Sequence, residues 1–131
     1  MSRTLLIVDD EPLIREIIRE KIGKHFEHIL EAENGAQGIF CLKQYPEVSM
    51  VVSDLKMPIM DGLEFLEEAR QLGYQKTFVY FTAMVKPQEV TRMSELGVKD
   101  IFFKGEINDW LKVVKNVLSG RHERVPTIEN D

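Results

Sequence analysis

The sequence contains one cysteine, one tryptophan and no long apolar run. Cys41 alone cannot form an internal disulfide, which fits a reducing compartment. No apolar stretch approaches the roughly 20 residues of a membrane-spanning helix. The first residues, MSRTLLIVDD, are too short and too acidic for a signal peptide. We therefore expect a cytoplasmic protein without membrane insertion.

An excess of basic residues is also missing. The 131 residues include 17 lysines and arginines against 22 aspartates and glutamates, a formal charge of −5. Nucleic-acid-binding domains usually carry a basic run or patch, so we expect no nucleic-acid partner. A hydrophobic content of 44% is sufficient for the core of one domain. We expect that domain over residues 1–119 and a polar, disordered tail over 120–131.

What the chain does contain is an alternation of short apolar runs with segments of helical periodicity. The runs are TLLIVD (4–9), HILEAE (28–33), MVVSD (50–54), TFVYFT (77–82) and IFFK (101–104). Apolar residues at helical spacing cover Leu13 to Ile22 and then about 35–44, 62–72, 87–96 and 106–119. The alternation predicts an α/β fold in which helices cover both faces of a parallel sheet.

Polar side chains stand at the predicted carboxyl ends of four strands. They are Asp9, Asp10 and Glu11 at the end of the first strand, Asp54 at the end of the third, Thr82 at the end of the fourth and Lys104 at the end of the fifth. Right-handed crossovers bring these ends to one edge of the sheet, where such folds bind their ligands. One polar residue at a strand end is ordinary, but four ends together indicate a functional site.

Three carboxylates at one edge repel each other unless a cation or a proton intervenes. Lys104 alone cannot neutralise three acids, and hard oxygen ligands with access to water suit Mg²⁺. We therefore expect a bound divalent cation. A site that offers a metal, an ammonium and a hydroxyl fits a phosphoryl group, and Asp54 then has the chemistry of a nucleophile that forms an aspartyl phosphate.

Four motifs in this order, LLIVDDEP, VVSDLKMPIMDG, FTA and FFK, resemble the receiver domain of bacterial two-component response regulators. The resemblance covers about residues 4–119. It implies a flavodoxin-like (βα)5 fold with the sheet order 2-1-3-4-5. It also implies a single-domain, chemotaxis-regulator-like phosphoacceptor rather than an enzyme in the usual sense.

By position, the resemblance implies a role for each site residue. Asp54 would be the phosphoacceptor and would also bind Mg²⁺. Asp10 would be a direct Mg²⁺ ligand, Asp9 would act largely through metal-bound water, and the backbone carbonyl of Lys56 would complete the protein ligands.

The same resemblance implies contacts with the phosphoryl group and with other proteins. Thr82 and Lys104 would bind the phosphoryl group, and Thr82 together with Ile101 would form the switch. The donor would be a sensor histidine kinase or a histidine phosphotransfer protein. A downstream protein would bind the face made by the fourth helix, the fifth strand and the fifth helix.

Three positions depart from the family pattern. Gly105 follows the lysine where the family usually has a cis-proline. A non-proline cis bond costs about 2.5–4 kcal/mol, so we expect a trans bond here. Ile101 replaces the usual tyrosine or phenylalanine, and Met84 stands where a polar residue is common.

Two alternatives stay open at this point. One is a receiver-like binding module that works without phosphorylation, which the Ile101 departure favours. The other is a Mg²⁺-dependent phosphatase with an aspartyl nucleophile. Such enzymes typically need a second acid two residues after the nucleophile, where this chain has Lys56.

Overall fold

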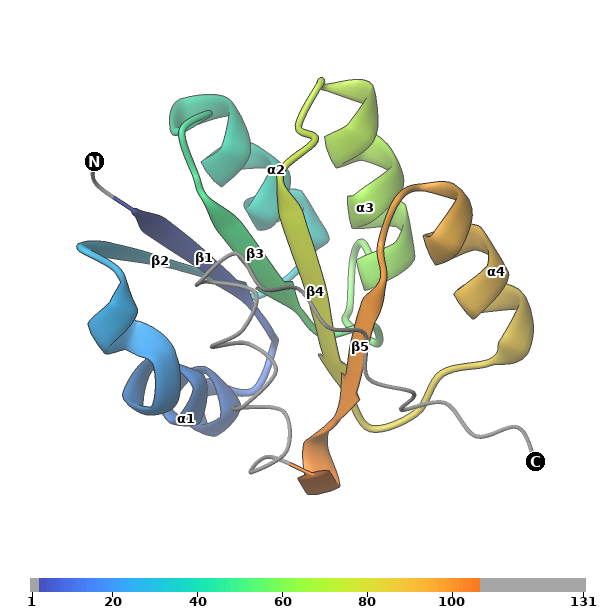
Figure 1. Ribbon diagram of the computed structural model, residues 1–131, viewed down its shortest axis with the longest axis horizontal. Helices are drawn as coiled ribbons and strands as arrows, with labels where there is room; N and C mark the ends of the chain where they lie inside the picture. Colours follow the sequence, from blue (N-terminus) through green and yellow to red (C-terminus); the bar gives the residue numbers. More distant parts are fainter. Residues whose placement is uncertain (1–2, 107–131) are drawn as a thin grey trace.

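The computed structural model describes residues 3–106. Strands and helices alternate along them (Figure 1). The elements are β1 (Thr4–Val8), α1 (Pro12–Ile22), β2 (His28–Ala32), α2 (Gly35–Gln44), β3 (Met50–Ser53), α3 (Gly62–Gln71), β4 (Thr77–Thr82), α4 (Pro87–Glu95) and β5 (Asp100–Phe103), with short 3₁₀ helices at Gly23–His25 and Lys104–Glu106. The helix predicted at 106–119 and the tail at 120–131 fall beyond the described range, apart from residue 106.

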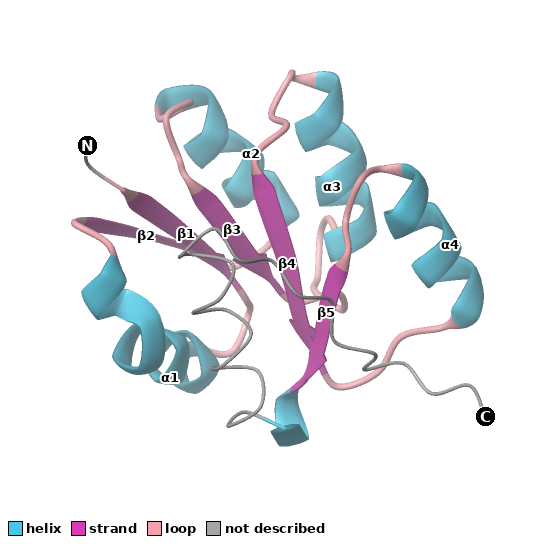
Figure 2. Ribbon diagram, viewed as in Figure 1, coloured by secondary structure: helices cyan, strands magenta, loops and turns pink. Residues whose placement is uncertain are grey.

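The five strands form one parallel sheet in the order β2-β1-β3-β4-β5 (Figure 2). In this sheet β1 is an interior strand, with Leu6 paired with Leu30 of β2 on one side and with Val51 of β3 on the other. The predicted fold class and strand order are therefore confirmed.

Two hydrophobic layers cover the sheet, because successive residues of a strand point to opposite faces. Leu6 and Val8 of β1 pack in the layer shared with α2, α3 and α4. Leu5 and Ile7 pack in the other layer, against α1. All residues of β1 are buried, as expected for a strand that is covered on both faces. Figure 1 shows α1 on one side of the sheet and α2, α3 and α4 on the other.

The loop between β3 and α3 is held close to the sheet by the start of α3. Asp61 caps this helix: its Oδ1 accepts hydrogen bonds from the N–H groups of Leu63 and Glu64. The Gly62 N–H donates to the Leu55 carbonyl at 2.8 Å. A Cβ atom on Gly62 would overlap the backbone carbonyl of Asp54 and lie 2.8 Å from Leu55 Cα. Glycine is thus needed where the helix approaches the chain next to Asp54.

Several predicted boundaries and one part of the helical pattern need correction. The strand β1 ends at Val8 and β3 at Ser53, so the aspartates follow the strands rather than end them, and Lys104 opens a 3₁₀ helix. Among the apolar residues at helical spacing, Leu13, Phe40 and Leu72 are exposed. Leu13 lies in the first turn of α1, Leu72 is the C-cap of α3, and Phe40 lies within α2.

No helix within residues 3–106 combines the length and the apolar character that crossing a bilayer requires.

Candidate functional site

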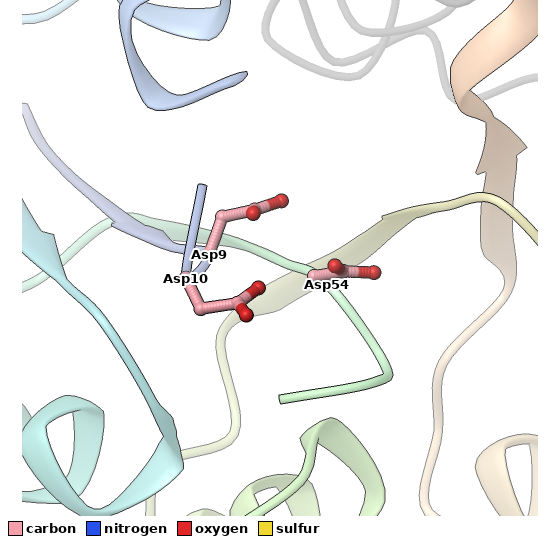
Figure 3. A group of neighbouring side chains, drawn as sticks. All are labelled: Asp9, Asp10 and Asp54. Carbon is pink, nitrogen blue, oxygen red and sulfur yellow. The ribbon is translucent and has the colours of Figure 1, made fainter. Parts of the chain in front are cut away.

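Three carboxylates from neighbouring strands meet at the carboxyl edge of the sheet. Asp9 and Asp10 follow β1, and Asp54 follows β3. Backbone hydrogen bonds continue the sheet past the strand ends, since the Asp54 N–H donates to the Val8 carbonyl at 2.8 Å. Each aspartate offers an oxygen within 4.8 Å of the others, and Figure 3 shows the three side chains extending to the same side of the chain. The structure therefore brings together the three aspartates that the sequence placed at this edge.

Lys104 places its ammonium among these carboxylates. Its Nζ lies 3.1 Å from Oδ2 of Asp54 and 3.2 Å from both Oδ2 of Asp9 and Oε1 of Glu11. Burial lowers the pKa of Lys104, but the charges of Asp54 and Asp9 outweigh burial and raise it above its usual value. The side chain, 17% exposed, therefore stays positively charged throughout the physiological range.

Among the three aspartates, Asp9 is the most deeply buried. It is 1% exposed, and burial raises its pKa to about 6, with the Asp54 carboxylate acting in the same direction. The N–H of Glu11, which donates to Oδ1 at 2.9 Å, and the ammonium of Lys104 oppose this rise. Oδ2 is within ion-pair distance of Lys104 but has no well-oriented hydrogen bond in the described part of the chain. Because buried oxygens usually accept hydrogen bonds, an oxygen without one is available to a cation nearby.

Both oxygens of Asp54 are engaged at fixed positions. Oδ1 accepts a hydrogen bond of 2.7 Å from the N–H of Leu55, and Oδ2 pairs with Lys104. Asp54 is 6% exposed, whereas Asp10 is exposed. The cluster therefore combines hard oxygen ligands with an opening to water, a donor set that suits Mg²⁺.

Lys56, two residues after Asp54, directs its side chain away from the cluster. Its Nζ lies 3.1 Å from Oε2 of Glu89 on α4. Glu89 also accepts a hydrogen bond from the N–H of Lys86 at the start of that helix. This ion pair links the loop after β3 to the beginning of α4. The role of the Lys56 backbone carbonyl stays a prediction.

Thr82 and Ile101 lie on β4 and β5. Thr82 is buried, and its hydroxyl donates to the Met84 carbonyl at 3.3 Å, in the loop that follows β4. Ile101 is buried in the core layer shared with α3 and α4 and pairs with Tyr80 of β4. The hydroxyl of Thr82 is thus bonded to the backbone of the loop after β4, and Ile101 belongs to the core. The bond between Lys104 and Gly105 is trans, as expected, since no described peptide bond is cis.

Sequence reasoning missed Arg15, whose Nη1 donates to the backbone carbonyl of Asp9 at 2.7 Å. A signal was nonetheless present. Helical side chains lean toward the N-terminus of their helix, and Arg15 lies in the first turns of α1, which starts directly after the acidic loop.

The chain is similar to known proteins of one family. The response regulator receiver domain model matches residues 5–115. The chain is 35% identical over 105 residues to the chemotaxis protein CheY of Bacillus subtilis (strain 168), an alignment that covers 79% of this chain and 87% of that protein. It is 30% identical over 121 residues to the sensor histidine kinase RcsC of Escherichia coli, covering 92% of this chain but only 12% of the kinase.

Solved structures show the same fold. A CheY-like receiver domain protein from Methanospirillum hungatei JF-1 superposes with a TM-score of 0.80 at 20% identity, covering 92% of this chain and 97% of that one. The CheX–CheY–BeF3–Mg complex from Borrelia burgdorferi gives a TM-score of 0.78 at 26% identity, covering 92% of this chain and 90% of that one.

Proposed function

Because the chain belongs to the response regulator receiver domain family, we propose that Asp54 accepts a phosphoryl group from a phosphohistidine. An oxygen of the Asp54 carboxylate attacks phosphorus and forms the new P–O bond. The P–N bond breaks, and its electron pair stays on the donor imidazole. The observation that carries this proposal is the ammonium of Lys104, which lies 3.1 Å from Asp54 and 3.2 Å from Asp9.

The placement of the surrounding groups supports such a transfer. The N–H of Leu55 fixes one oxygen of Asp54, which leaves the carboxylate with a defined orientation. Lys104 already stands beside the other oxygen, so its charge is available to the phosphoryl oxygens once they arrive. The hydroxyl of Thr82 would exchange its bond to the Met84 carbonyl for a bond to the phosphoryl group.

A divalent cation fits the same site. Asp9, Asp10, Asp54 and the backbone carbonyl of Lys56 would hold Mg²⁺. When bound, it would neutralise charge on the phosphoryl oxygens. The three neighbouring aspartates support this assignment, as does the similarity to a CheY whose complex contains BeF3 and Mg.

Partners follow from the family. We expect the donor to be a sensor histidine kinase or a histidine phosphotransfer protein. A downstream protein would bind the face formed by α4, β5 and the helix predicted at 106–119. Thr82 and Ile101 would couple the site to that face. The ion pair between Lys56 and Glu89 supports such coupling, because it ties the loop after Asp54 to α4.

The phosphatase alternative loses support. A hydrolase of that kind would use an acid two residues after the nucleophile, and Lys56 occupies that position with its ammonium engaged by Glu89.

Incubation with acetyl phosphate and Mg²⁺, followed by intact-mass spectrometry, tests the proposal. One added phosphoryl group is expected, and it should be absent in Asp54→Asn and after chelation of the metal. Asp61→Asn is the matched control, because asparagine caps a helix as well as aspartate does and Asp61 serves as the cap of α3. Equal labelling of Asp54→Asn and Asp61→Asn would reject Asp54 as the acceptor. No labelling of the wild type would favour the phosphorylation-independent binding module.

A further inference from the structure

The guanidinium of Arg15 joins two parts of the molecule at the edge of the site. Its Nη1 donates to the backbone carbonyl of Asp9 at 2.7 Å, and its Nε donates to Oε1 of Glu31 on β2 at 2.8 Å. The Arg15 side chain is only 13% exposed. A cation tied at both ends in this way has little freedom to move.

Glu31 is itself held by a second arginine. Nε and Nη2 of Arg19 donate to its Oε2 at 3.0 and 2.6 Å. Burial would raise the pKa of Glu31, but the hydrogen bonds and charges of Arg19 and Arg15 outweigh burial and lower it. Glu31 is therefore ionised at neutral pH, and its position on β2, opposite Ile7 of β1, anchors Arg15 to the sheet.

The carbonyl that Arg15 holds belongs to the peptide that joins Asp9 to Asp10. The N–H of Asp9 is also fixed, since it donates to the Ala32 carbonyl at 3.1 Å. Within residues 3–106, in contrast, no hydrogen bond or ion pair restrains the Asp10 carboxylate. The Asp10 side chain therefore takes its direction from the backbone, and the peptide before it has its carbonyl bonded to Arg15.

We propose that Arg15, anchored by Glu31, is a positioning residue for divalent-cation binding. It acts through the peptide between Asp9 and Asp10 and touches neither the cation nor the phosphoryl group. This inference rests on the proposed function, because it requires the cation site at the acidic cluster.

Charge and position predict opposite results when Arg15 is replaced. Removing a positive charge beside an acidic cluster strengthens the attraction for a cation. Losing a hydrogen bond that orients the metal ligands weakens cation binding. Replacing a residue that orients metal ligands typically lowers metal affinity 10–100-fold. The direction of the change in Mg²⁺ affinity therefore separates a positioning role from a purely electrostatic one.

The experiment is a Mg²⁺ titration followed by the NMR shifts of the backbone amides of Asp10 and Leu55. Arg15→Gln is compared with Arg19→Gln, which loses the same charge and the same partner, Glu31, but has no contact with Asp9. We expect the Kd for Mg²⁺ to rise about tenfold in Arg15→Gln. In Arg19→Gln it should stay within about twofold of the wild type. Urea unfolding of each variant reports on the integrity of the fold.

Arg15→Lys keeps the charge, but a single ammonium cannot reproduce both contacts of the guanidinium. Its Kd should lie between those of the wild type and Arg15→Gln, and it also serves if Arg15→Gln fails to fold. An unchanged or lower Kd in Arg15→Gln, or equal increases in both glutamine variants, would overturn the inference while leaving the proposed function intact. A wild type that shows no Mg²⁺-dependent shifts would overturn both.

Discussion

The ammonium of Lys104 lies 3.1 Å from Oδ2 of Asp54, although 50 residues separate the two in sequence. Lys104 follows β5 and Asp54 follows β3, with β4 between these strands. The contact therefore spans the carboxyl edge of the sheet. It also brings the lysine within 3.2 Å of the buried Asp9. One ammonium therefore balances the charges of three carboxylates, those of Asp9, Glu11 and Asp54.

Asp9 should make the metal-free protein less stable as the pH rises. Burial raises its pKa from 3.8 to about 6, so the folded state binds this proton more tightly than the unfolded chain does. Stability is then lost between about pH 4 and pH 6 and is not regained above that range. The pKa difference corresponds to about 3 kcal/mol as an upper estimate.

Asp9→Asn removes that titration and keeps an acceptor for the N–H of Glu11. In urea unfolding with EDTA, we expect the variant to be more stable than the wild type by about 2 kcal/mol at pH 7.5. The two should converge below pH 4. Equal stabilities at pH 7.5 would show that Lys104 fully compensates the buried charge.

Gly62→Ala should destabilise the fold by about 3 kcal/mol, because the added Cβ would overlap backbone atoms of Asp54 and Leu55 that cannot move aside easily. Gly105→Ala, beside Lys104, is the control, since its Cβ would meet nothing within 4 Å. Denaturant midpoints of both variants provide the measurement. A Gly62→Ala midpoint equal to that of Gly105→Ala would mean that the loop relaxes freely.

Ile59→Gly should stabilise the protein. Ile59 has a φ of 71°, and the N–H of Met60 donates to the Pro58 carbonyl across it at 2.7 Å, the pattern of a strained γ-turn. Its side chain is 83% exposed and gains little from burial. Relief of strain should exceed the entropic cost of glycine. We expect the free energy of unfolding to rise by about 1 kcal/mol.

Ile59→Val is the comparison, because valine is also β-branched and keeps the strain. It should unfold at the wild-type midpoint. A loss of stability in Ile59→Gly would indicate that the left-handed conformation costs isoleucine little in this loop.

Ile101→Phe should strengthen the response to phosphorylation. We expect the movement of Thr82 toward a phosphoryl group to leave space that a stiff, β-branched isoleucine fills poorly. An aromatic side chain would fill more of that space and favour the active state. NMR shifts of the α4 amides, with and without beryllofluoride, report the change. Shifts already saturated in the wild type, with no gain from phenylalanine, would rule out this role for position 101.

The fold was largely predictable because its signals are local and repeated. Five apolar runs at regular spacing indicate a parallel sheet whatever the details of packing. The proximity of Asp9, Asp54 and Lys104 follows from the same topology, since the carboxyl ends of parallel strands share one edge. The sheet order, in contrast, came from the resemblance to a family, since alternation does not determine which strands are neighbours.

Contacts between single side chains could not be predicted in the same way. The pair Arg15–Glu31 depends on how far α1 extends over β2, and an arginine on an amphipathic helix looks like any solvated charge. The pair Lys56–Glu89 likewise requires the position of α4. The positive φ of Ile59 contradicts the preference of β-branched residues, because hydrogen bonds of the surrounding loop fix the backbone there.

Borohydride trapping tests the central claim most directly. The protein is phosphorylated with acetyl phosphate and Mg²⁺ and then treated with borohydride, which reduces an aspartyl phosphate to homoserine. Peptide mapping by mass spectrometry locates the reduced residue. We expect homoserine at position 54 alone, and only when Mg²⁺ is present. Homoserine at another aspartate, or an equal yield at position 54 without a divalent cation, would contradict it.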